Sequence, residues 1–448
     1  MAQHLCKLPC IPIDIILKFT DSSRDLVNLI SASPRCYRVY KHKPAVYQLA
    51  AIQNAIPAPL WPDFCALHLA TQYFGGPDRS SVAARDKDEV TSFLDQHFFG
   101  ALPADLPVSE ENFDLARGLV HKIEWLIKDF TETVGAEARC LQKMYSYRSG
   151  QQVQDDADCL TDDAPSTEFG LSDPERLRLY RAFIQFELCC VLFHPSPTRS
   201  PLHGTYSGRD QHDLLFSRLE IWEVEAIACI HQYLTGFIRS ACDSLDDKFE
   251  TFARSLAPEP HLKWPMLQTY YGEGAKISAG LGFMLDFARG DQSTQLKLLQ
   301  KYTVKHDPLY TALSFLREDQ ALCTLTEPST DDGAEASASY IKHYASSTAG
   351  HFEDDEVVYF PMRALGCVFW DSKRLESRLF TDARLYIRLM DQEQGYDWAT
   401  DRYTRKNQPS PEQALQNVYI PFLQEYGLKE HFGMDDGSYL DLVPKFGW

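Results

Sequence analysis

The sequence predicts a mainly α-helical protein, with a small N-terminal helical module followed by one large, irregular helical domain. Apolar residues recur at helical spacing along most of the chain, whereas alternating strand patterns are scarce and no series of hairpin turns occurs. An aromatic content of 12% over 448 residues supplies large side chains for a core and argues against disorder. We therefore expect a helical module at residues 1–55 and a large α-helical domain at residues 56–448.

The module opens with an apolar run at residues 11–17, which has a proline near its start. A second helix is predicted over residues 25–30, where the Asp25 carboxylate would accept hydrogen bonds from the free backbone N–H groups of the first turn. A Ser-Pro pair at 33–34 and a Tyr/Val run at 37–40 close this stretch. Together these signals indicate several short helices.

The large domain contains two clear helices. Residues 110–148 begin with acids and end with bases, which suits the helix dipole. Their apolar side chains share one face, namely Leu115, Leu119, Ile123, Leu126, Ile127 and Phe130. Ser172 and Glu175 form a capping box with Pro174 in the first turn, and the helix that they start ends in FIQFELCCVLF, which is apolar on nearly all sides. This second helix is predicted to lie at the centre of the core.

Further helices are expected over residues 211–256 and 292–317, the latter broken before a proline, and again within 375–426. Polar loops are expected near 150–170, which carries acids and no bases, and at 326–337. Strands are most plausible at 357–360 and 367–370, although each run fits a helical core equally well.

Charge and composition exclude several classes of function. A net charge of −19 repels phosphate backbones and anionic membranes, so we expect no nucleic acid and no membrane partner, whereas a basic protein partner is compatible. No run reaches the roughly 18 apolar residues of a membrane span, and no signal peptide is expected. The twelve cysteines have no zinc-site spacing, and free thiols suit a reducing compartment. We therefore predict a cytoplasmic or nuclear protein without a metal or cofactor.

No catalytic residue can be assigned. Glu187 lies in an apolar helix and needs a partner, for which a buried ion pair with an arginine is favoured over a catalytic acid. Glu223 and Glu225 fall on opposite sides of a helix, and one of them could pair with Arg218. The glycine-rich stretch 272–282 lacks the order of a phosphate loop and is favoured as a loop packed closely against a helix. The chain is therefore predicted not to be an enzyme.

Residues 8–47 resemble an F-box, a short helical module that docks on a linker protein of a cullin-type ubiquitin ligase. Ile11-Pro12, or Leu8-Pro9, stands where that family has its Leu-Pro, and Asp25-Leu26 stands where its second helix starts. The interval from Pro12 to Asp25 is shorter than usual, and Tyr37 replaces a frequent tryptophan. The resemblance implies a partner-binding set of Pro12, Leu26, Leu29, Ile30, Arg35 and Val39.

Segments 221–230 and 365–371 resemble uncharacterised filamentous-fungal proteins that often begin with the same F-box-like stretch. The leading hypothesis is a substrate-recruiting adaptor. The second is a structural or interaction protein whose N-terminal module is only internal packing, and the third is an enzyme with an unidentified site. Exposure of Leu26, Leu29, Ile30 and Val39 separates the first two, whereas a deep pocket gathering acids or histidines would favour the third.

Overall fold

The computed structural model describes residues 10–75, 87–103, 105–107, 109–149, 170–193, 206–256, 277–291 and 365–394, together with 294, 295, 297, 298, 309, 312, 313 and 363. Of these residues 83% are helical and none forms a strand, so the predicted mainly α fold is confirmed. Most of the loop predicted at 150–170, the loop at 326–337, the possible strand at 357–360 and most of 292–317 lie outside the described residues.

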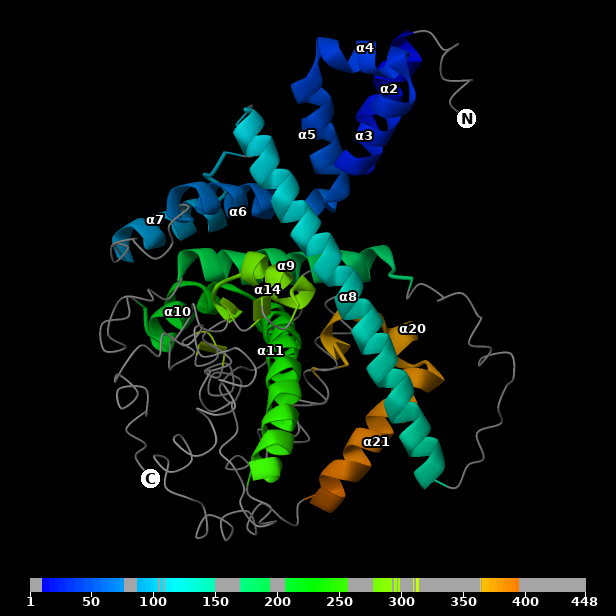
Figure 1. The fold of residues 1–448 in the computed structure, drawn as a ribbon. Coiled ribbons are helices and arrows are strands. Elements are labelled where there is room, and N and C mark those ends of the chain that lie inside the picture. The colour runs from blue at the N-terminus through cyan, green and yellow to red at the C-terminus, as the bar shows by residue number, and fades with distance from the viewer. Residues whose placement is uncertain are drawn as a thin grey trace.

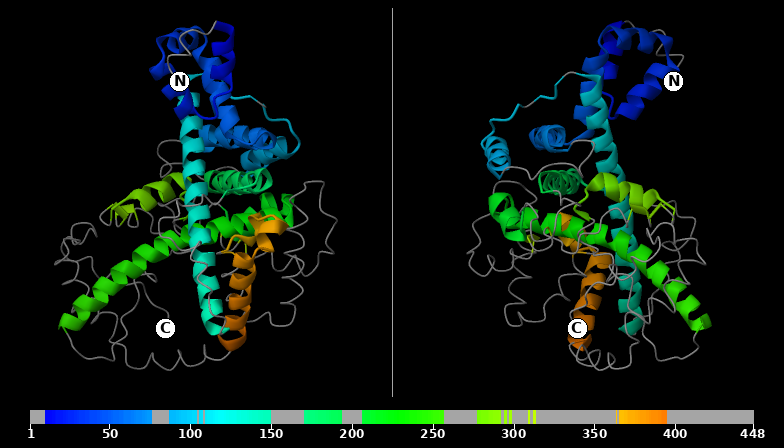
Figure 2. Two further views of the ribbon diagram at one scale, coloured as in Figure 1. Left: turned by 90° about the vertical axis from the view of Figure 1, so that its right-hand side faces the viewer. Right: turned by 60° about the vertical axis from the view of Figure 1, so that its left-hand side comes forward.

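Four helices form the N-terminal module: α2 (Cys10–Lys18), α3 (Ser23–Ala32), α4 (Pro34–His42) and α5 (Pro44–Ala55). They surround a small core of their own, made of Ile13, Leu17, Leu26, Cys36, Tyr47 and Ala51. Figures 1 and 2 show α2, α3 and α4 standing out from the rest of the molecule, with α5 leading back to it. The module is thus packed chiefly on itself.

The remaining helices enclose a second, much larger core. They are η1 (Ala58–Leu60), α6 (Trp61–Phe74), α7 (Lys87–Phe98), α8 (Glu110–Arg148), α9 (Asp173–Leu192), α10 (Gly208–Leu214), η3 (Phe216–Arg218), α11 (Ile221–Leu256), α14 (Leu281–Arg289), η4 (Cys367–Phe369), α20 (Ser372–Leu375) and α21 (Arg378–Gln394). Helix α9 packs against both α6 and α11. This arrangement places α9 at the centre, as its apolar sequence predicts.

Helix α8 connects the two ends of the molecule. Its 39 residues span roughly 58 Å at the rise of an α-helix, and its start is capped by Ser109, whose hydroxyl accepts from the Asn112 N–H at 3.2 Å. It packs on α5 and on α21, and Figure 2 shows α21 beside its distal half. The bounds match the predicted helix at 110–148.

The predicted start of α9 is confirmed, whereas the predicted start of α3 is corrected. Ser172 and Glu175 form the predicted capping box of α9. Helix α3, however, begins before Asp25, because the Ser22 hydroxyl accepts from the Asp25 N–H at 3.1 Å and is the N-cap. Asp25 instead lies in the first turn, where a negative charge still suits the helix dipole.

The apolar run at 367–370 lies in the helical core, which was one of its two predicted placements. Residues Cys367–Phe369 form the 3₁₀ turn η4, and Phe369 and Trp370 are fully buried. Phe130 of α8 meets the Phe369 ring edge to face, with ring centroids 5.4 Å apart. Gly366 precedes the turn at a φ of +57°, and a Cβ there would come within 2.8 Å of the Phe130 ring.

Candidate partner-binding surface

The second-helix face that we expected to be free for a partner is turned toward the module's own core. Leu26 is only 2% exposed, and Leu29, Ile30 and Val39 are partly buried against the same small cluster. Leu26 is therefore a core residue rather than an available docking side chain. The apolar pattern identifies the buried face of α3 but cannot distinguish a core from a partner.

A second apolar stripe lies on the outer side of α2. Pro12, Ile15 and Phe19 follow at spacings of three and four, whereas Ile13 and Leu17 point the other way into the module core. Pro12 is half-buried, Ile15 is 50% exposed and Phe19 is 76% exposed. Pro12, one of the predicted site residues, thus belongs to a surface that was not predicted from the sequence. Its signal is that apolar residues lie on both sides of the helix over residues 11–19.

The outer side of α4 is basic. Arg38 and Lys41 are exposed at a spacing of three, Tyr37 beside them is 50% exposed, and the predicted Arg35 is half-buried. Residues 10–55 contain six Lys or Arg and three Asp or Glu, in a chain whose net charge is −19. The module therefore carries a charge of the opposite sign to the rest of the protein.

Polar side chains of α5 hold α2 in place. The Tyr47 hydroxyl donates to Asp14 at 2.5 Å, and the Asn54 amide donates to the carbonyls of Lys18 and Thr20 at 2.8 and 3.0 Å. The hydrogen bonds from Tyr47 and Lys18 hold the pKa of Asp14 below its usual value. Burial and the Asp14 contact raise the pKa of Tyr47 to about 12. These contacts fix the orientation of the outer stripe on α2.

Glu187 stabilises the start of another helix. Its Oε2 accepts from the Leu281 backbone N–H at 2.6 Å, although Glu187 is only 1% exposed. Gly280 allows this approach, since it has a φ of +90° and a Cβ there would lie 2.6 Å from that oxygen. The partner that the described residues show is the N-terminus of α14, and the predicted pairing with an arginine stays a prediction. The glycine-rich stretch does pack closely against a helix, as predicted, at Gly280.

Two further buried carboxylates form bidentate ion pairs with arginines. Glu225 accepts from Arg363 at 2.8 and 2.8 Å, and Glu175 accepts from Arg374 at 2.7 and 2.7 Å. Glu225 is 3% exposed and Glu175 is fully buried. These pairs bind α9 and α11 to residues 363–375, so both acids serve the fold.

The predicted ion pair of Arg218 with Glu223 or Glu225 is wrong. Arg218 binds Asp95 of α7 at 2.6 Å, whereas Glu223 faces Arg181 at 3.7 Å. Glu223 and Glu225 therefore do point to different sides of α11, as their spacing indicates. Arg218 precedes α11 and is free to reach another helix.

Reactive groups are not gathered in the described part of the chain. It contains no group of three or more His, Cys, Asp or Glu placed to hold a metal ion. Burial raises the pKa of Cys65 and Cys367 to about 12 and also raises that of Cys189, so these thiols are poor nucleophiles. Among the described helices, none is long and apolar enough to cross a membrane.

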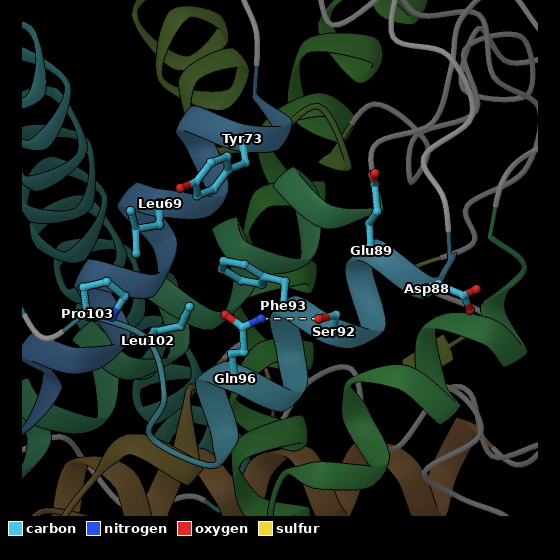
Figure 3. Close-up of a pocket in the computed structure, with 9 residues that line it drawn as sticks. All are labelled: Leu69, Tyr73, Asp88, Glu89, Ser92, Phe93, Gln96, Leu102 and Pro103. Carbon is cyan, nitrogen blue, oxygen red and sulfur yellow. Dashed lines mark hydrogen bonds between the residues drawn. The ribbon is translucent and has the colours of Figure 1, made fainter.

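A hollow of about 650 Å³ lies between α6 and α7. Figure 3 shows its lining: Leu69, Tyr73, Asp88, Glu89, Ser92, Phe93, Gln96, Leu102 and Pro103. It has two acids at one end and no histidine in its lining. It is therefore not the deep pocket of acids or histidines that would favour an enzyme.

Comparison with known proteins gives no relative. No known protein family matches the chain, and neither do the curated proteins or the solved structures compared with it.

Proposed function

We propose that this protein is a non-enzymatic adaptor in the cytoplasm or nucleus. Its N-terminal module would dock on the linker protein of a cullin-type ubiquitin ligase, as the F-box resemblance implies, and its large domain would hold a protein substrate. The observation that carries the proposal is the outward stripe of Pro12, Ile15 and Phe19 on a module with a separate core.

The burial of Leu26 and the partial burial of Leu29, Ile30 and Val39 count against docking through that face, whereas the separate core favours an adaptor that docks through another face of the module. If the module served only to cover the large domain, its apolar side chains would be expected to merge with the large core. Leu26, Leu29 and Ile30 instead pack within the module, and among the described helices only α5 contributes buried residues to both cores. The outer faces of α2 and α4 are left available.

The exposed apolar side chains of the described residues are concentrated on this module. Ten large ones are exposed in all, and five belong to it, namely Ile15, Phe19, Val27, Tyr37 and Val46. Buried aromatic and aliphatic anchors dominate most protein interfaces. The exposed Arg38 and Lys41 would suit a partner that carries acidic groups around an apolar groove.

The proposal is tested by calorimetric titration of the full-length protein with the purified ligase linker protein. We expect the wild type to bind. The double variant Ile15→Asp, Phe19→Asp should lose at least about 30-fold in affinity, because two charges would enter a dry interface.

The matched control is Met144→Asp with Tyr147→Asp, since these side chains form an exposed apolar pair on α8 and are 45% and 91% exposed. This control should bind like the wild type. A wild-type protein that does not bind the linker would refute the adaptor function. Normal binding by the Ile15/Phe19 variant would show that α2 is not the docking surface.

A further inference from the structure

The hollow between α6 and α7 has an apolar interior whose walls belong to the main core. Leu69 and Tyr73, one helical turn apart, form its α6 side, and Phe93 lies across from them on α7 (Figure 3). Leu69 and Phe93 are 6% and 7% exposed, and Phe93 meets Phe74 edge to face with ring centroids 5.5 Å apart. The walls are thus held by the main core.

An aromatic side chain stands at the rim of this hollow. Tyr73 is 74% exposed, yet it extends the apolar wall begun by Leu69. Tyrosine combines a large apolar ring with a polar tip and is common at interface centres. Covering this ring would bury apolar area that now faces water.

The two ends of the hollow differ in polarity. Leu102 and Pro103 lie at one end, whereas Asp88 and Glu89 lie at the other (Figure 3). The Glu89 side chain is exposed and makes no hydrogen bond or ion pair among the residues that the structure describes. The neighbouring Lys87 is held elsewhere, since its Nζ lies 2.5 Å from Asp210. The Glu89 carboxylate therefore keeps a negative charge that a basic partner can neutralise.

The dimensions select an elongated occupant. Glu89 and Phe93 are four residues apart on α7, which corresponds to about 6 Å along the helix axis. About two residues of an extended chain cover the same length, and side chains two positions apart point to the same face of such a chain. A peptide with a large apolar side chain and a basic one about two positions apart would therefore reach the apolar wall and Glu89 at once.

We propose that this hollow binds a short basic segment of a partner protein. A large apolar side chain of that segment lies between Leu69, Tyr73 and Phe93, and a Lys or Arg about two positions away pairs with Glu89. The net charge of −19 also favours a basic segment over an acidic one. The inference concerns the large domain alone and does not depend on whether the N-terminal module docks on a linker protein.

The test uses the full-length protein and fluorescein-labelled peptides in which a phenylalanine and an arginine are about two positions apart, in both orders. A companion set has glutamine in place of arginine, and binding is measured by fluorescence anisotropy. For one order, the arginine peptide should bind at least about 3-fold more tightly than its glutamine companion. Glu89→Gln should abolish this preference, and Tyr73→Ser should weaken both peptides at least about 5-fold.

Two control variants match the substituted residues in chemistry and exposure. Glu110 is an exposed acid in the first turn of α8, as Glu89 is in α7, and Tyr147 is an exposed tyrosine far along α8. Glu110→Gln and Tyr147→Ser should bind both peptides like the wild type.

Three outcomes would overturn the inference. The first is no saturable binding of either arginine peptide up to about 1 mM. The second is an arginine preference that survives in Glu89→Gln. The third is self-association of the wild type in sedimentation that Tyr73→Ser removes, which would assign the hollow to a second copy of this chain.

Discussion

Single contacts at the residue scale explain how some partly exposed carboxylates keep their charge and stabilise the fold. Asp371 shows the balance: burial alone would raise its pKa, but the hydrogen bond from Ser172 and the hydrogen bond and charge of Arg178 outweigh burial and keep the pKa below its usual value. Because the folded-state pKa is depressed, this carboxylate stabilises the fold at neutral pH, and the stabilisation is lost as the pH falls through that lowered pKa. Asp14 in the module follows the same rule.

Tyr47→Phe should therefore lower the stability of the module at neutral pH. The variant loses the strongest contact that depresses the pKa of Asp14. Its stability deficit relative to the wild type should shrink as the pH falls below the ordinary value of 3.8 for this group. Urea unfolding at several pH values, followed by hydrogen exchange of the α2 amides, measures this.

Tyr37→Phe is the control, because the Tyr37 side chain is 50% exposed. This substitution should leave the unfolding midpoint unchanged at every pH. A Tyr47→Phe deficit that does not vary with pH would contradict the role of Asp14.

Gly280→Ala should destabilise the protein by about 2–4 kcal/mol. A φ of +90° strains any other residue, and the added Cβ would push the Glu187 carboxylate from the α14 terminus. Urea denaturation measures the loss.

Gly236→Ala is the opposite case, since that glycine lies in α11 with open space around its Cβ position, and it should stabilise the protein by about 0.5–1 kcal/mol. Equal effects of the two substitutions would refute this account.

At the scale of a single helix, the side on which a residue lies decides how much a charged substitution destabilises the fold. Leu29 and Ile30 of α3 lie on the same side as the buried Leu26, whereas Val27 is 49% exposed on another side. A charge on the inner face must lose water in the module core, but a charge at Val27 stays hydrated.

The variant Leu29→Asp, Ile30→Asp should consequently unfold the module, at a cost of about 3 kcal/mol or more. Hydrogen exchange of α2, α3 and α4 should lose protection while α9 keeps it. Val27→Asp should leave the module folded. If the double variant keeps full protection of α3, the inner face is not needed for packing, and the sequence-based docking face would regain support.

The sequence predicts elements whose signals are local. Helix α8 was bounded correctly because its acids, apolar stripe and terminal bases lie within one segment, and the start of α9 because its capping box is complete within four residues. The cap of α3 was misplaced by a few residues because Ser22 and Asp25 are both good capping residues. Such errors come from competing local signals.

Contacts between distant segments could not be predicted in the same way. Glu187 meets Leu281, 94 residues further along the chain, and nothing near Glu187 in the sequence indicates a helix terminus there. The exposed stripe on α2 was missed for a related reason, since Ile13 and Leu17 and the outward Ile15 and Phe19 are all apolar. Apolar periodicity alone does not predict which side of a helix packs into a small core.

At the scale of the whole molecule, two cores of unequal size imply unequal stability. The module core has six buried apolar residues, whereas the main core spans most of the other described helices. Since stability rises with the area that folding buries, the module should open more readily than the large domain.

Amides of α2 to α4 should accordingly exchange with solvent at least about 10-fold faster than those of α9, which corresponds to about 1.4 kcal/mol in opening free energy. Hydrogen exchange read by mass spectrometry on peptides from both regions tests this. Helix α5 should be intermediate, because it contributes to both cores. Identical exchange in α3 and α9 would show that the molecule unfolds as one unit.

Helix α5 also determines how the N-terminal module is oriented relative to the large domain. Tyr47 and Ala51 pack in the module core, whereas Ala45, Leu49, Ile52 and Ala55 of the same helix pack against the main core. The two sets therefore interleave along α5 and lie on different sides of it. Each residue of an α-helix turns the chain by about 100° and advances it by about 1.5 Å. One residue inserted between Ala51 and Ile52 would turn Tyr47 and Ala51 by that angle relative to Ile52 and Ala55, so α5 could no longer fill both cores in the present orientation. The register of α5 thus sets the direction in which the stripe of Ile15 and Phe19 faces relative to the large domain.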